Sequence, residues 1–572
     1  MSAETRARTA LVRAELQAAG LDACLVRGTD RFLNEYVPRV DSTRTWLTGF
    51  DGSTGEAFLP ALESLPGLLS VDGRYELQAE DQTAETAFEV NHVPLGQSVW
   101  ESHCQRVATW ARAQASRPRL GYPSRRCDEK ALRVLRDALA EDAELVACVE
   151  SPVVRARGAI EEVPGLIRAV DPARGGGTLR EKLARIRGSL AAAGVDAFLV
   201  QRLDALAWLT GLRANELPYQ ATFRGVGLIT PEALALALPG GAGRLPQGAD
   251  PGLSVVAELP LQAGLRVGYV RSATSVSWLD AIRAAGATPV AIPCPLSSLM
   301  ATKSAGEFEA MREAFARADR VMEGAIAFVN QRVDAGERVT EADLAAQVEA
   351  LFKELGAHGL SFKVIAAAGA NGAHIHYSTP DPERAIVAGE LVLLDMGGYF
   401  AEGYATDLTR TWVAGSQPEA DPLQRERYTR VLQGAMAGMS ARLPVGTSGQ
   451  QLDALVRAPI WAGGYDYRHG TGHGVGVNVH EAPPRIGTRG GTPVEQGQVF
   501  SIEPGVYLEG WGGIRIENLC TLEPAPGAPG FLDMVPLTFA ALDERLIDET
   551  LLNETERAWL DRYAARRAEV LA

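Results

Sequence analysis

Five side chains of metal-ligand type lie in three separate stretches of the last third of the chain. The stretches are LLDMGGYFAEGYATDLTRT, HGTGHGVGVNVHE and FSIEPGVYLEGWGGIRIENL, and they supply Asp395, Asp407, His473, Glu503 and Glu517. Four carboxylates and one imidazole, without a thiolate, suit a pair of Mn²⁺, Co²⁺, Fe²⁺ or Zn²⁺ ions better than a closed structural zinc site. Converging carboxylates repel one another unless cations lie between them. These residue types therefore predict a two-metal hydrolytic centre.

The first two aspartates are expected on the two arms of a hairpin. The apolar residues 391–394 predict a buried strand that delivers Asp395 at its end, just before two glycines release the chain into a turn. The next strand is expected to begin near Tyr404 and to place Asp407 and Thr409 on one face. An isolated aspartate at such a place would be read as a turn or cap residue, but the combination with the later motifs favours metal ligands.

Glycines surround His473 at every second position, which allows close approach of the backbone. His473 and His480 are seven positions apart, so a regular strand would send them to opposite faces. If both enter one cleft, the chain must bulge or turn near Gly474 or Gly476. A lone histidine is more often structural than functional. Here, five of the eight histidines fall in two short stretches, which weakens that interpretation: His374, His376, His469, His473 and His480.

The third stretch predicts one strand before Glu503 and another that carries Glu517. The strand VFSI leads to Glu503, and Pro504 ends it. GGIRIENL alternates, which places Arg515 and Glu517 together on the polar face. A guanidinium there can orient a ligand carboxylate without binding metal itself. The alternative is an ordinary surface ion pair, which would not need the two glycines in front of the strand.

Two similar segments earlier in the chain indicate tandem α/β domains. Residues 11–26 predict a helix, a glycine turn and an apolar strand, and residues 182–200 repeat this order. The tetrapeptide WLTG follows each copy, at Trp46 and at Trp208. The offset between the copies is 174 residues, far longer than a solenoid repeat, and favours two related domains.

Glycine and proline clusters indicate where the domains end. The three glycines of DPARGGGTLR and the prolines of AIPCPLSSLM predict domains at residues 1–170, 171–297 and 298–572. In the first domain, SVDGRYELQAEDQ predicts a strand, an Asp-Gly turn and a polar helix. In the third, apolar residues at helical spacing after Lys303 predict one long helix, and the capping pair Thr340 and Asp343 begins a second.

Composition bounds the class of protein. The 572 residues are 46% hydrophobic and 22% charged, as in ordinary globular proteins, and the net charge of −15 disfavours nucleic acid and anionic membranes as partners. The N-terminus lacks the continuous apolar segment of a signal peptide, and no run of about 18 apolar residues could span a bilayer. We therefore expect a cytoplasmic protein. The six scattered cysteines predict neither a disulfide framework nor a zinc knuckle.

These motifs together resemble the pita-bread metallopeptidases, which include methionine aminopeptidase, prolidase, aminopeptidase P and creatinase. The chain is most similar to the three-domain cytosolic form of aminopeptidase P, because TWLTGFDGSTGEA, VDGRYELQAE, ALAWLTGLR and LIDETLLNETERAWLDRY also look like segments of that group. The resemblance covers nearly the whole chain. It implies a mixed α/β (α+β) fold, with two tandem related creatinase-like N-terminal α/β domains followed by a pita-bread catalytic domain.

The resemblance also assigns roles to the metal ligands. It implies that Asp395 chelates one metal, that Asp407 and Glu517 bridge the pair, and that His473 and Glu503 complete the other. Family members most often use Mn²⁺, and some use Co²⁺ or Zn²⁺. A hydroxide held between the two metals would attack the scissile carbonyl, and Glu503 would pass a proton to the leaving nitrogen.

The same resemblance implies substrate contacts for three histidines. His376 would contact the substrate near the scissile bond, His469 would shape the pocket for proline, and His480 would hydrogen-bond the carbonyl oxygen as it becomes anionic. His374 is the rival of His376 and is given a structural role, because the family's marker histidine directly precedes the tyrosine, here Tyr377. The spacing of the first two aspartates is read as one residue longer than the family's usual eleven, which predicts a longer turn or bulge around residues 400–402.

The resemblance implies an aminopeptidase that removes the N-terminal residue from peptides whose second residue is proline. An Xaa-Pro bond lacks the N–H that ordinary aminopeptidases bind, so a dedicated pocket is needed. A homodimer is also implied.

Prolidase, which accepts only Xaa-Pro dipeptides, is the nearest alternative, but prolidases usually have one N-terminal domain. A creatinase lacks the full ligand set. A non-catalytic binding module on the same fold is disfavoured, because such relatives have lost ligands that this chain keeps.

Overall fold

The computed structural model describes residues 2–162, 164–231 and 233–571, and the chain forms two compact units. The first unit contains the chain up to Ala169 together with Thr178–Pro218 and Thr222–Leu296. The second contains Val170–Gly177, Tyr219–Ala221 and the chain from Ser297 onward. The candidate site residues all belong to the second unit.

The first unit begins with a six-stranded mixed sheet in the order β4-β3-β2-β1-β5-β6. The central strand β1 pairs antiparallel with β2 and parallel with β5, and the outer pairs β3–β4 and β5–β6 are parallel. The strands are β1 (Ala23–Val26), β2 (Glu56–Pro60), β3 (Gly67–Asp72), β4 (Phe88–Val93), β5 (Arg119–Pro123) and β6 (Glu144–Cys148). The accompanying helices are α1 (Ser2–Ala18), α2 (Thr43–Thr48), α3 (Glu76–Thr83), α4 (Val99–Arg112), α5 (Glu129–Leu139) and α6 (Pro152–Arg157).

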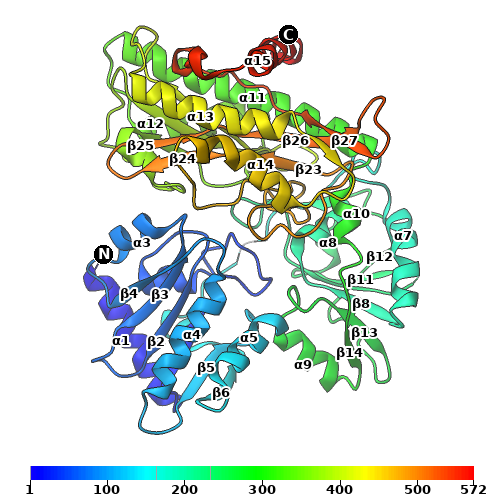
Figure 1. Cartoon of the computed structure of the whole chain (residues 1–572). Coiled ribbons are helices and arrows are strands. Elements are labelled where there is room, and N and C mark those ends of the chain that lie inside the picture. Colours follow the sequence, from blue (N-terminus) through cyan, green and yellow to red (C-terminus); the bar gives the residue numbers. More distant parts are fainter. Residues whose placement is uncertain (1, 163, 232, 572) are drawn as a thin grey trace. The chain divides into compact units, whose positions relative to one another are not determined.

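A second sheet in the same unit repeats this topology in the order β12-β11-β10-β8-β13-β14, with the same parallel and antiparallel pairs (Figure 1). Its strands are β8 (Ala197–Val200), β10 (Val226–Ile229), β11 (Leu234–Ala237), β12 (Leu253–Val256), β13 (Arg266–Tyr269) and β14 (Thr288–Ala291). Helices α7 (Leu179–Ala192), α8 (Leu203–Thr210) and α9 (Val276–Ala284) accompany it, and β7 (Arg168–Ala169) pairs with β9 (Leu212–Arg213). The predicted tandem repeat is confirmed.

The WLTG tetrapeptide has the same structural role in both copies. It forms the end of a short helix, α2 or α8, and its glycine adopts the left-handed conformation, with φ 83° at Gly49 and 68° at Gly211. Glycine reaches this region without steric cost and ends the helix there. The tetrapeptide WLTG therefore recurs because each domain ends a short helix with the same type of glycine cap.

The second unit builds its core from a three-stranded sheet, a four-stranded sheet and three two-stranded ribbons. The antiparallel sheets are β16 (Ile365–Ala368), β17 (Leu391–Met396) and β19 (Leu408–Val413), and then β20 (Arg442–Pro444), β27 (Phe531–Pro536), β26 (Asn518–Pro524) and β23 (Val499–Ile502). The ribbons pair β15 (Gly359–Leu360) with β18 (Gly398–Tyr399), β21 (Gly472–His473) with β22 (Arg485–Ile486), and β24 (Gly505–Leu508) with β25 (Gly512–Arg515).

Long helices pack against these sheets. Helix α11 contacts α12 and β19, while α13 contacts α14, β23 and β27 (Figure 1). Ser304 and Thr340 cap α11 and α12 with reciprocal capping boxes, as predicted for α12 from Thr340 and Asp343. The helices are α10 (Ser297–Ala301), α11 (Ala305–Asp334), α12 (Glu341–Glu354), α13 (Pro422–Met439), α14 (Gly449–Ala462) and α15 (Glu554–Leu571).

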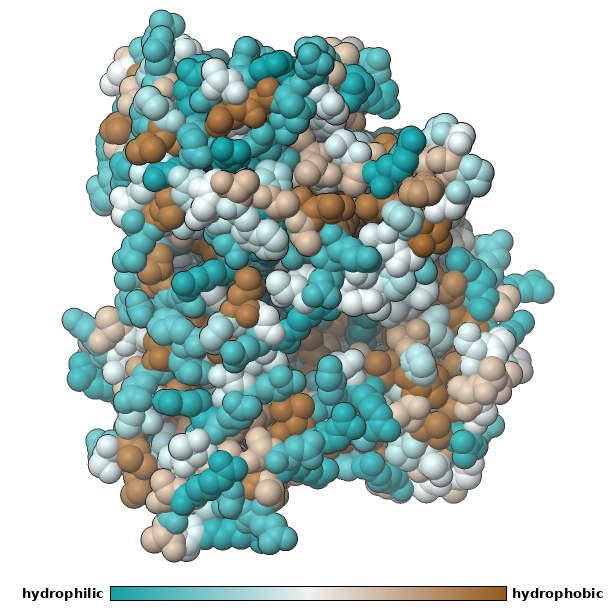
Figure 2. All heavy atoms as spheres, in the orientation of Figure 1, coloured by the Kyte–Doolittle hydropathy of each residue, from teal (hydrophilic) through white to brown (hydrophobic). Residues whose placement is uncertain are grey.

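The surface is mostly polar on the visible face. Hydrophilic side chains cover much of the visible face and are interspersed with small apolar areas (Figure 2). None of the helices in the described part of the chain is long and apolar enough to cross a membrane. All six cysteines lie among the described residues and are free thiols, four of them buried.

Candidate metal centre

The fold of the second unit brings the five predicted ligands to one place from different strands. Asp395 lies in β17, Asp407 directly precedes β19, His473 ends β21, Glu503 directly follows β23, and Glu517 lies between β25 and β26. Strand pairing explains the meeting of the first two: Asp395 faces Thr409 across the β17–β19 ladder. Because Thr409 and Asp407 are two positions apart, their side chains and that of Asp395 share one face.

Two details of this hairpin differ from the sequence-based expectation. Strand β19 begins at Leu408 and not near Tyr404, because residues 400–406 form the turn, where the Gly403 N–H donates to the Phe400 carbonyl at 3.0 Å and Gly403 has φ 67°. The predicted extra residue does not exist. The residues between the two aspartates are 396–406, which is the family's usual eleven, and the turn needs no additional bulge.

Glu517 is positioned by a change of strand partner. GGIRIENL does not form one continuous strand, because β25 pairs with β24 whereas β26 pairs with β23. At the joint, the Glu517 N–H donates to the Thr409 carbonyl at 3.2 Å, which ties the residue to β19. Arg515 and Glu517 therefore lie at a junction between two sheets, where both side chains are buried and both contact the Thr409 hydroxyl.

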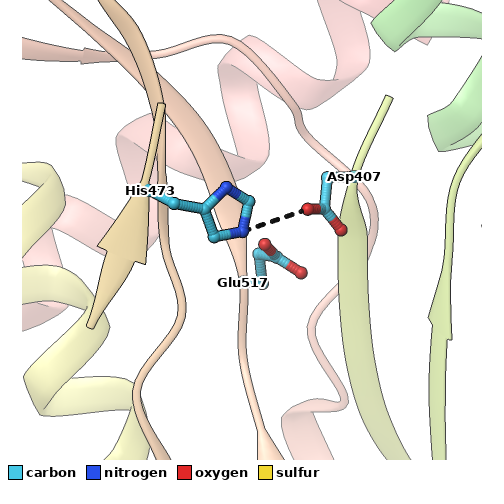
Figure 3. A group of neighbouring side chains, drawn as sticks. All are labelled: Asp407, His473 and Glu517. Atoms are coloured by element: carbon cyan, nitrogen blue, oxygen red, sulfur yellow. Dashed lines mark ion pairs between the residues drawn. The ribbon is translucent and has the colours of Figure 1, made fainter. Parts of the chain in front are cut away.

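The imidazole of His473 lies between carboxylates. Its Nε2 is 3.5 Å from Oδ2 of Asp407 and 3.5 Å from Oε1 of Glu503. Ligand atoms of Asp407, His473 and Glu517 all lie within 4.8 Å of one another, and Figure 3 shows the three side chains pointing toward a common point. A divalent ion bound there would touch donors from three separate stretches of the sequence.

Asp395, the fifth predicted ligand, is held by Arg515. Arg515 Nη2 donates to Oδ2 of Asp395 at 2.7 Å, while Oδ1 of the same carboxylate is buried and has no hydrogen-bond partner among the described residues. A buried carboxylate oxygen without a donor is costly, and a bound cation would remove that cost. The predicted orienting role of Arg515 is consistent with this contact.

The electrostatics of the centre are those of crowded carboxylates. Burial, followed by the charges of Glu517 and Asp395, raises the pKa of Asp407 well above the usual carboxyl value. Burial, followed by the charges of Asp395 and Glu503, does the same to the pKa of Glu517. The guanidinium of Arg515 lowers the pKa of both residues but does not outweigh the other effects. The protein alone therefore leaves negative charge uncompensated.

Two residues that sequence reasoning left without a role connect the ligands. The Thr409 hydroxyl donates to Oε2 of Glu517 at 2.8 Å and accepts from Nε of Arg515 at 3.1 Å. Tyr507 accepts a hydrogen bond from Arg515 Nη1 at 2.8 Å, and burial raises the pKa of its hydroxyl to about 12. The alternation of polar residues that includes Asp407 and Thr409 was the available signal for Thr409. No sequence signal pointed to Tyr507.

Of the three substrate histidines, His469 joins this network through Tyr507. Its Nε2 is hydrogen-bonded to the Tyr507 hydroxyl at 2.9 Å, and its Nδ1 is 3.8 Å from Oε2 of Glu503. His469 is buried, with a relative exposure of 7%. It therefore lies beside the ligand group, on the side of Glu503.

His480 reaches the same region because the chain turns, as the parity argument required. After the two-residue strand β21, the Glu481 N–H donates to the Gly474 carbonyl at 2.8 Å, and the rings of His473 and His480 lie edge to face with centroids 4.4 Å apart. A side chain at Gly476 would collide with the Glu481 carboxylate. Lys303 pairs with that carboxylate at 2.8 Å in a buried ion pair, which fixes the turn.

His376 lies on a segment that is linked to the centre through Arg515. It follows the 3₁₀ turn Gly369–Ala373 and is half-buried. The carbonyl of the preceding residue, Ile375, accepts a hydrogen bond from Arg515 Nη1 at 3.3 Å. The rings of His374 and Tyr377 have centroids 5.8 Å apart.

The residues present fit a pair of divalent cations. The donor set consists of carboxylate oxygens and one imidazole nitrogen, which suits hard or borderline metal ions. The partnerless oxygen of Asp395 and the raised pKa values of Asp407 and Glu517 are the features that bound cations would relieve.

Comparisons with known proteins identify the family of the chain and agree with its fold. Residues 309–524 match metallopeptidase family M24, and residues 8–156 and 165–238 each match the creatinase/prolidase N-terminal domain. A probable Xaa-Pro aminopeptidase P of Laccaria bicolor is 31% identical over 98% of this chain and 89% of its own. The chain therefore belongs to the M24 metallopeptidases that carry creatinase/prolidase N-terminal domains, and it matches Xaa-Pro aminopeptidases P over almost its whole length.

Solved structures establish the architecture. The X-prolyl aminopeptidase of Caenorhabditis elegans, described as a cytosolic enzyme with a di-nuclear active site, has a TM-score of 0.88 at 24% identity over 99% of this chain and 96% of its own. The prolidase of Pyrococcus horikoshii has a TM-score of 0.54 at 25% identity and covers 63% of this chain and 99% of its own. The predicted fold class, two creatinase-like domains followed by a pita-bread domain, is confirmed.

Proposed function

We propose that this protein is a metal-dependent aminopeptidase that hydrolyses the N-terminal Xaa-Pro bond of peptides. The observation that carries the proposal is the convergence of four carboxylates and one imidazole in a chain related over 98% of its length to Xaa-Pro aminopeptidase P. Asp395, Asp407, His473, Glu503 and Glu517 would hold two divalent ions, and the oxygen-rich set favours Mn²⁺, with Co²⁺ or Zn²⁺ as alternatives. The ions would polarise the scissile carbonyl and lower the pKa of the attacking water.

Side chains around the ligands would supply proton transfer and binding. Glu503 lies at the edge of the ligand group, with one oxygen 3.5 Å from His473 and the other 3.8 Å from His469, so it would carry a proton to the leaving nitrogen. His480, whose ring adjoins His473, would donate to the carbonyl oxygen as it becomes anionic. His376 would contact the substrate near the scissile bond, and His469 would shape the proline pocket.

Substrate length separates this function from that of a prolidase. The archaeal prolidase covers 63% of this chain, so more than a third of the chain has no counterpart in it. We therefore favour peptides longer than dipeptides as substrates. We also propose domains at residues 1–170, 171–297 and 298–572, a homodimer and a cytoplasmic location, which rest on the sequence patterns and the family resemblance.

One add-back experiment tests this function. The purified protein is stripped with a chelator, Mn²⁺, Co²⁺ or Zn²⁺ is added separately, and hydrolysis of Ala-Pro-Ala, Ala-Pro and Ala-Ala-Ala is compared. We expect metal-dependent release of alanine from Ala-Pro-Ala alone, fastest with Mn²⁺. Cleavage confined to the dipeptide would identify a prolidase, and no metal-dependent cleavage of any of the three would exclude the proposed chemistry. Light scattering of the reloaded protein tests the homodimer.

A further inference from the structure

The carboxylate of Glu341 is fully buried, although this residue belongs to none of the stretches that supply the metal ligands. It is the first residue of α12, and its relative exposure is 0%. A buried carboxylate requires compensation, either from a cation or from several hydrogen-bond donors. No cation forms an ion pair with Glu341 among the contacts of the described residues. Hydrogen-bond donors therefore compensate the charge of the Glu341 carboxylate.

All the side-chain hydrogen bonds of Glu341 come from one short segment. Oε1 accepts from the Ala368 N–H at 2.7 Å and from Asn371 Nδ2 at 3.0 Å. Oε2 accepts from the Tyr377 hydroxyl at 2.8 Å and from the Asp381 N–H at 3.1 Å. The Asn371 amide also donates to the Tyr377 hydroxyl at 3.0 Å. One carboxylate thus binds the segment 368–381 at four points along its length.

This segment carries His376 and connects to the metal-ligand group. Its 3₁₀ turn packs against β17 and β25, and backbone atoms of Gly372 and Gly513 approach so closely that neither position could hold a side chain without displacement. The Ile375 carbonyl accepts a hydrogen bond from Arg515, which also donates to Asp395. His376 therefore lies between two anchors: the bond from Arg515 to residue 375 and the bond from Tyr377 to Glu341.

We propose that Glu341 is a positioning residue that holds His376 in its working orientation beside the metal centre by binding the segment 368–381 from behind. This inference rests on the proposed function for the role of His376. The hydrogen bonds that the Glu341 side chain makes among the described residues go to residues 368–381 and to no ligand carboxylate, so it acts through this segment.

The chemistry explains why a carboxylate is required at this position. All the partners of Glu341 are donors, and an ionised carboxylate offers only acceptors. A glutamine of the same shape would turn an NH₂ group toward at least one N–H or O–H and leave donors unsatisfied in a buried place. Glu341 also stands at the N-terminus of α12, where the helix dipole favours negative charge. Burial is the largest cause that raises the pKa of Tyr377, and the charge of Glu341 is the next. The hydroxyl therefore stays protonated and can act as a donor.

The primary test compares E341Q with D343N. Asp343 is in the same helix turn, but it is exposed and accepts its hydrogen bonds from Thr340, at 2.9 and 2.8 Å. We expect E341Q to lower kcat/KM for Ala-Pro-Ala by about 10-fold to 100-fold, because small displacements of a positioned group have large effects on rate. D343N should stay within about twofold of the wild type. Bound metal per chain, measured by elemental analysis, should be the same in both variants, and loss of metal from E341Q would overturn the proposal.

A double-mutant cycle asks whether the effect passes through His376. In an H376A background, E341Q should lower kcat/KM by less than about threefold, because the group that Glu341 positions is already absent. An equal loss in both backgrounds would mean that Glu341 supports the fold in general, and the proposal would fail. If E341Q does not fold, Y377F provides the same cycle. It removes one donor, keeps the ring, and should cost about threefold to tenfold in the wild-type background only.

Hydrogen exchange provides a readout that does not depend on activity. Peptides covering residues 368–381 should exchange at least about tenfold faster in E341Q than in the wild type, while D343N leaves them unchanged. Unchanged protection in E341Q overturns the proposal even if activity falls. If the wild-type protein failed to cleave Ala-Pro-Ala, the proposed function would be wrong. The exchange result would still decide whether Glu341 holds this segment.

Discussion

Two of the regions that bury charged side chains, one in the first sheet domain and one at the metal centre, balance that charge in opposite ways. In the first sheet domain, the buried carboxylate of Glu56 lies 3.5 Å from Arg27 and accepts the Gly28 N–H at 3.2 Å. The Arg27 guanidinium also stacks on Trp100, 3.9 Å from the ring centroid, and Arg44 is buried nearby. Here guanidinium groups lie beside the carboxylate, and both Arg27 and Arg44 lower the pKa of Glu56.

At the metal centre the balance is reversed. Burial is the largest cause that raises the pKa of both Glu56 and Asp407, but the neighbours then act with opposite sign. Arg27 lowers the pKa of Glu56, whereas Glu517 and Asp395 raise that of Asp407 further. Burial of a charge is therefore not in itself the mark of a functional site. The mark is buried charge of one sign that the protein leaves unmatched, because only an added cation can then complete the site.

The strongest test of this contrast is D407N. Loss of the Asp407 carboxylate should abolish metal binding and lower activity by more than about 10³-fold. The same substitution removes a repelling charge, so chelator-treated D407N should melt at a higher temperature than chelator-treated wild type. Metal content, activity and thermal midpoint are measured on one preparation. A lower midpoint for metal-free D407N would contradict the idea that the carboxylates repel one another.

The matching change in the first domain, E56Q, should have the opposite pattern. It leaves Arg27 buried without its countercharge, so we expect a loss of about 3 kcal/mol in the free energy of unfolding of that domain, which is about two orders of magnitude in the unfolding constant. Activity per folded molecule should not change. Denaturant unfolding followed by tryptophan fluorescence measures the loss. If E56Q were as stable as the wild type, the pair would not balance the buried charge.

R515K sharpens the comparison within the metal centre. Lysine keeps the charge but cannot donate at once to Asp395, Tyr507 and Thr409, as Arg515 does at 2.7, 2.8 and 3.1 Å. We expect metal affinity or kcat/KM to fall by about 10-fold to 100-fold. Titration of the metal-free protein with Mn²⁺ measures the affinity. Equal affinity in R515K would indicate that charge alone orients Asp395.

The smallest predicted effect is a pH dependence of the thermal stability of the metal-free protein. The pKa values of Asp407 and Glu517 are raised in the fold above the ordinary carboxyl value of about 4, so the folded state binds these protons more tightly than the unfolded chain does. This contribution stabilises the fold at low pH and is lost as the pH rises through the raised values. Between about pH 5 and pH 8, the thermal midpoint should fall by about 2 to 4 °C more without metal than with Mn²⁺. If the thermal midpoint changed equally with pH in the presence and absence of Mn²⁺, the raised pKa values of Asp407 and Glu517 would not be responsible.

The sequence predicted the elements that local patterns specify. The repeated helix and strand of the first two domains, the capping box at Thr340 and the long helix α11 formed as expected, because periodicity and capping act within a few residues. Strand boundaries were less accurate. Strand β19 begins four residues later than predicted, because the turn around Gly403 continues until the ladder with β17 starts. Likewise, GGIRIENL divides into two strands, since each half finds a different partner.

The amino-acid sequence by itself determined the chemistry of this protein, because the residue types of the ligand stretches already exclude a thiolate site and require cations. It also determined the need for a turn after His473, since strand parity is a local property. Only the tertiary structure decided which side chains support that chemistry. Contacts with residues distant in the chain give importance to Thr409, Tyr507 and Glu341. Likewise, only the folded structure shows that no hydrogen-bond donor among the described residues reaches Oδ1 of Asp395. Such contacts depend on where separate strands and helices meet, which no local pattern encodes.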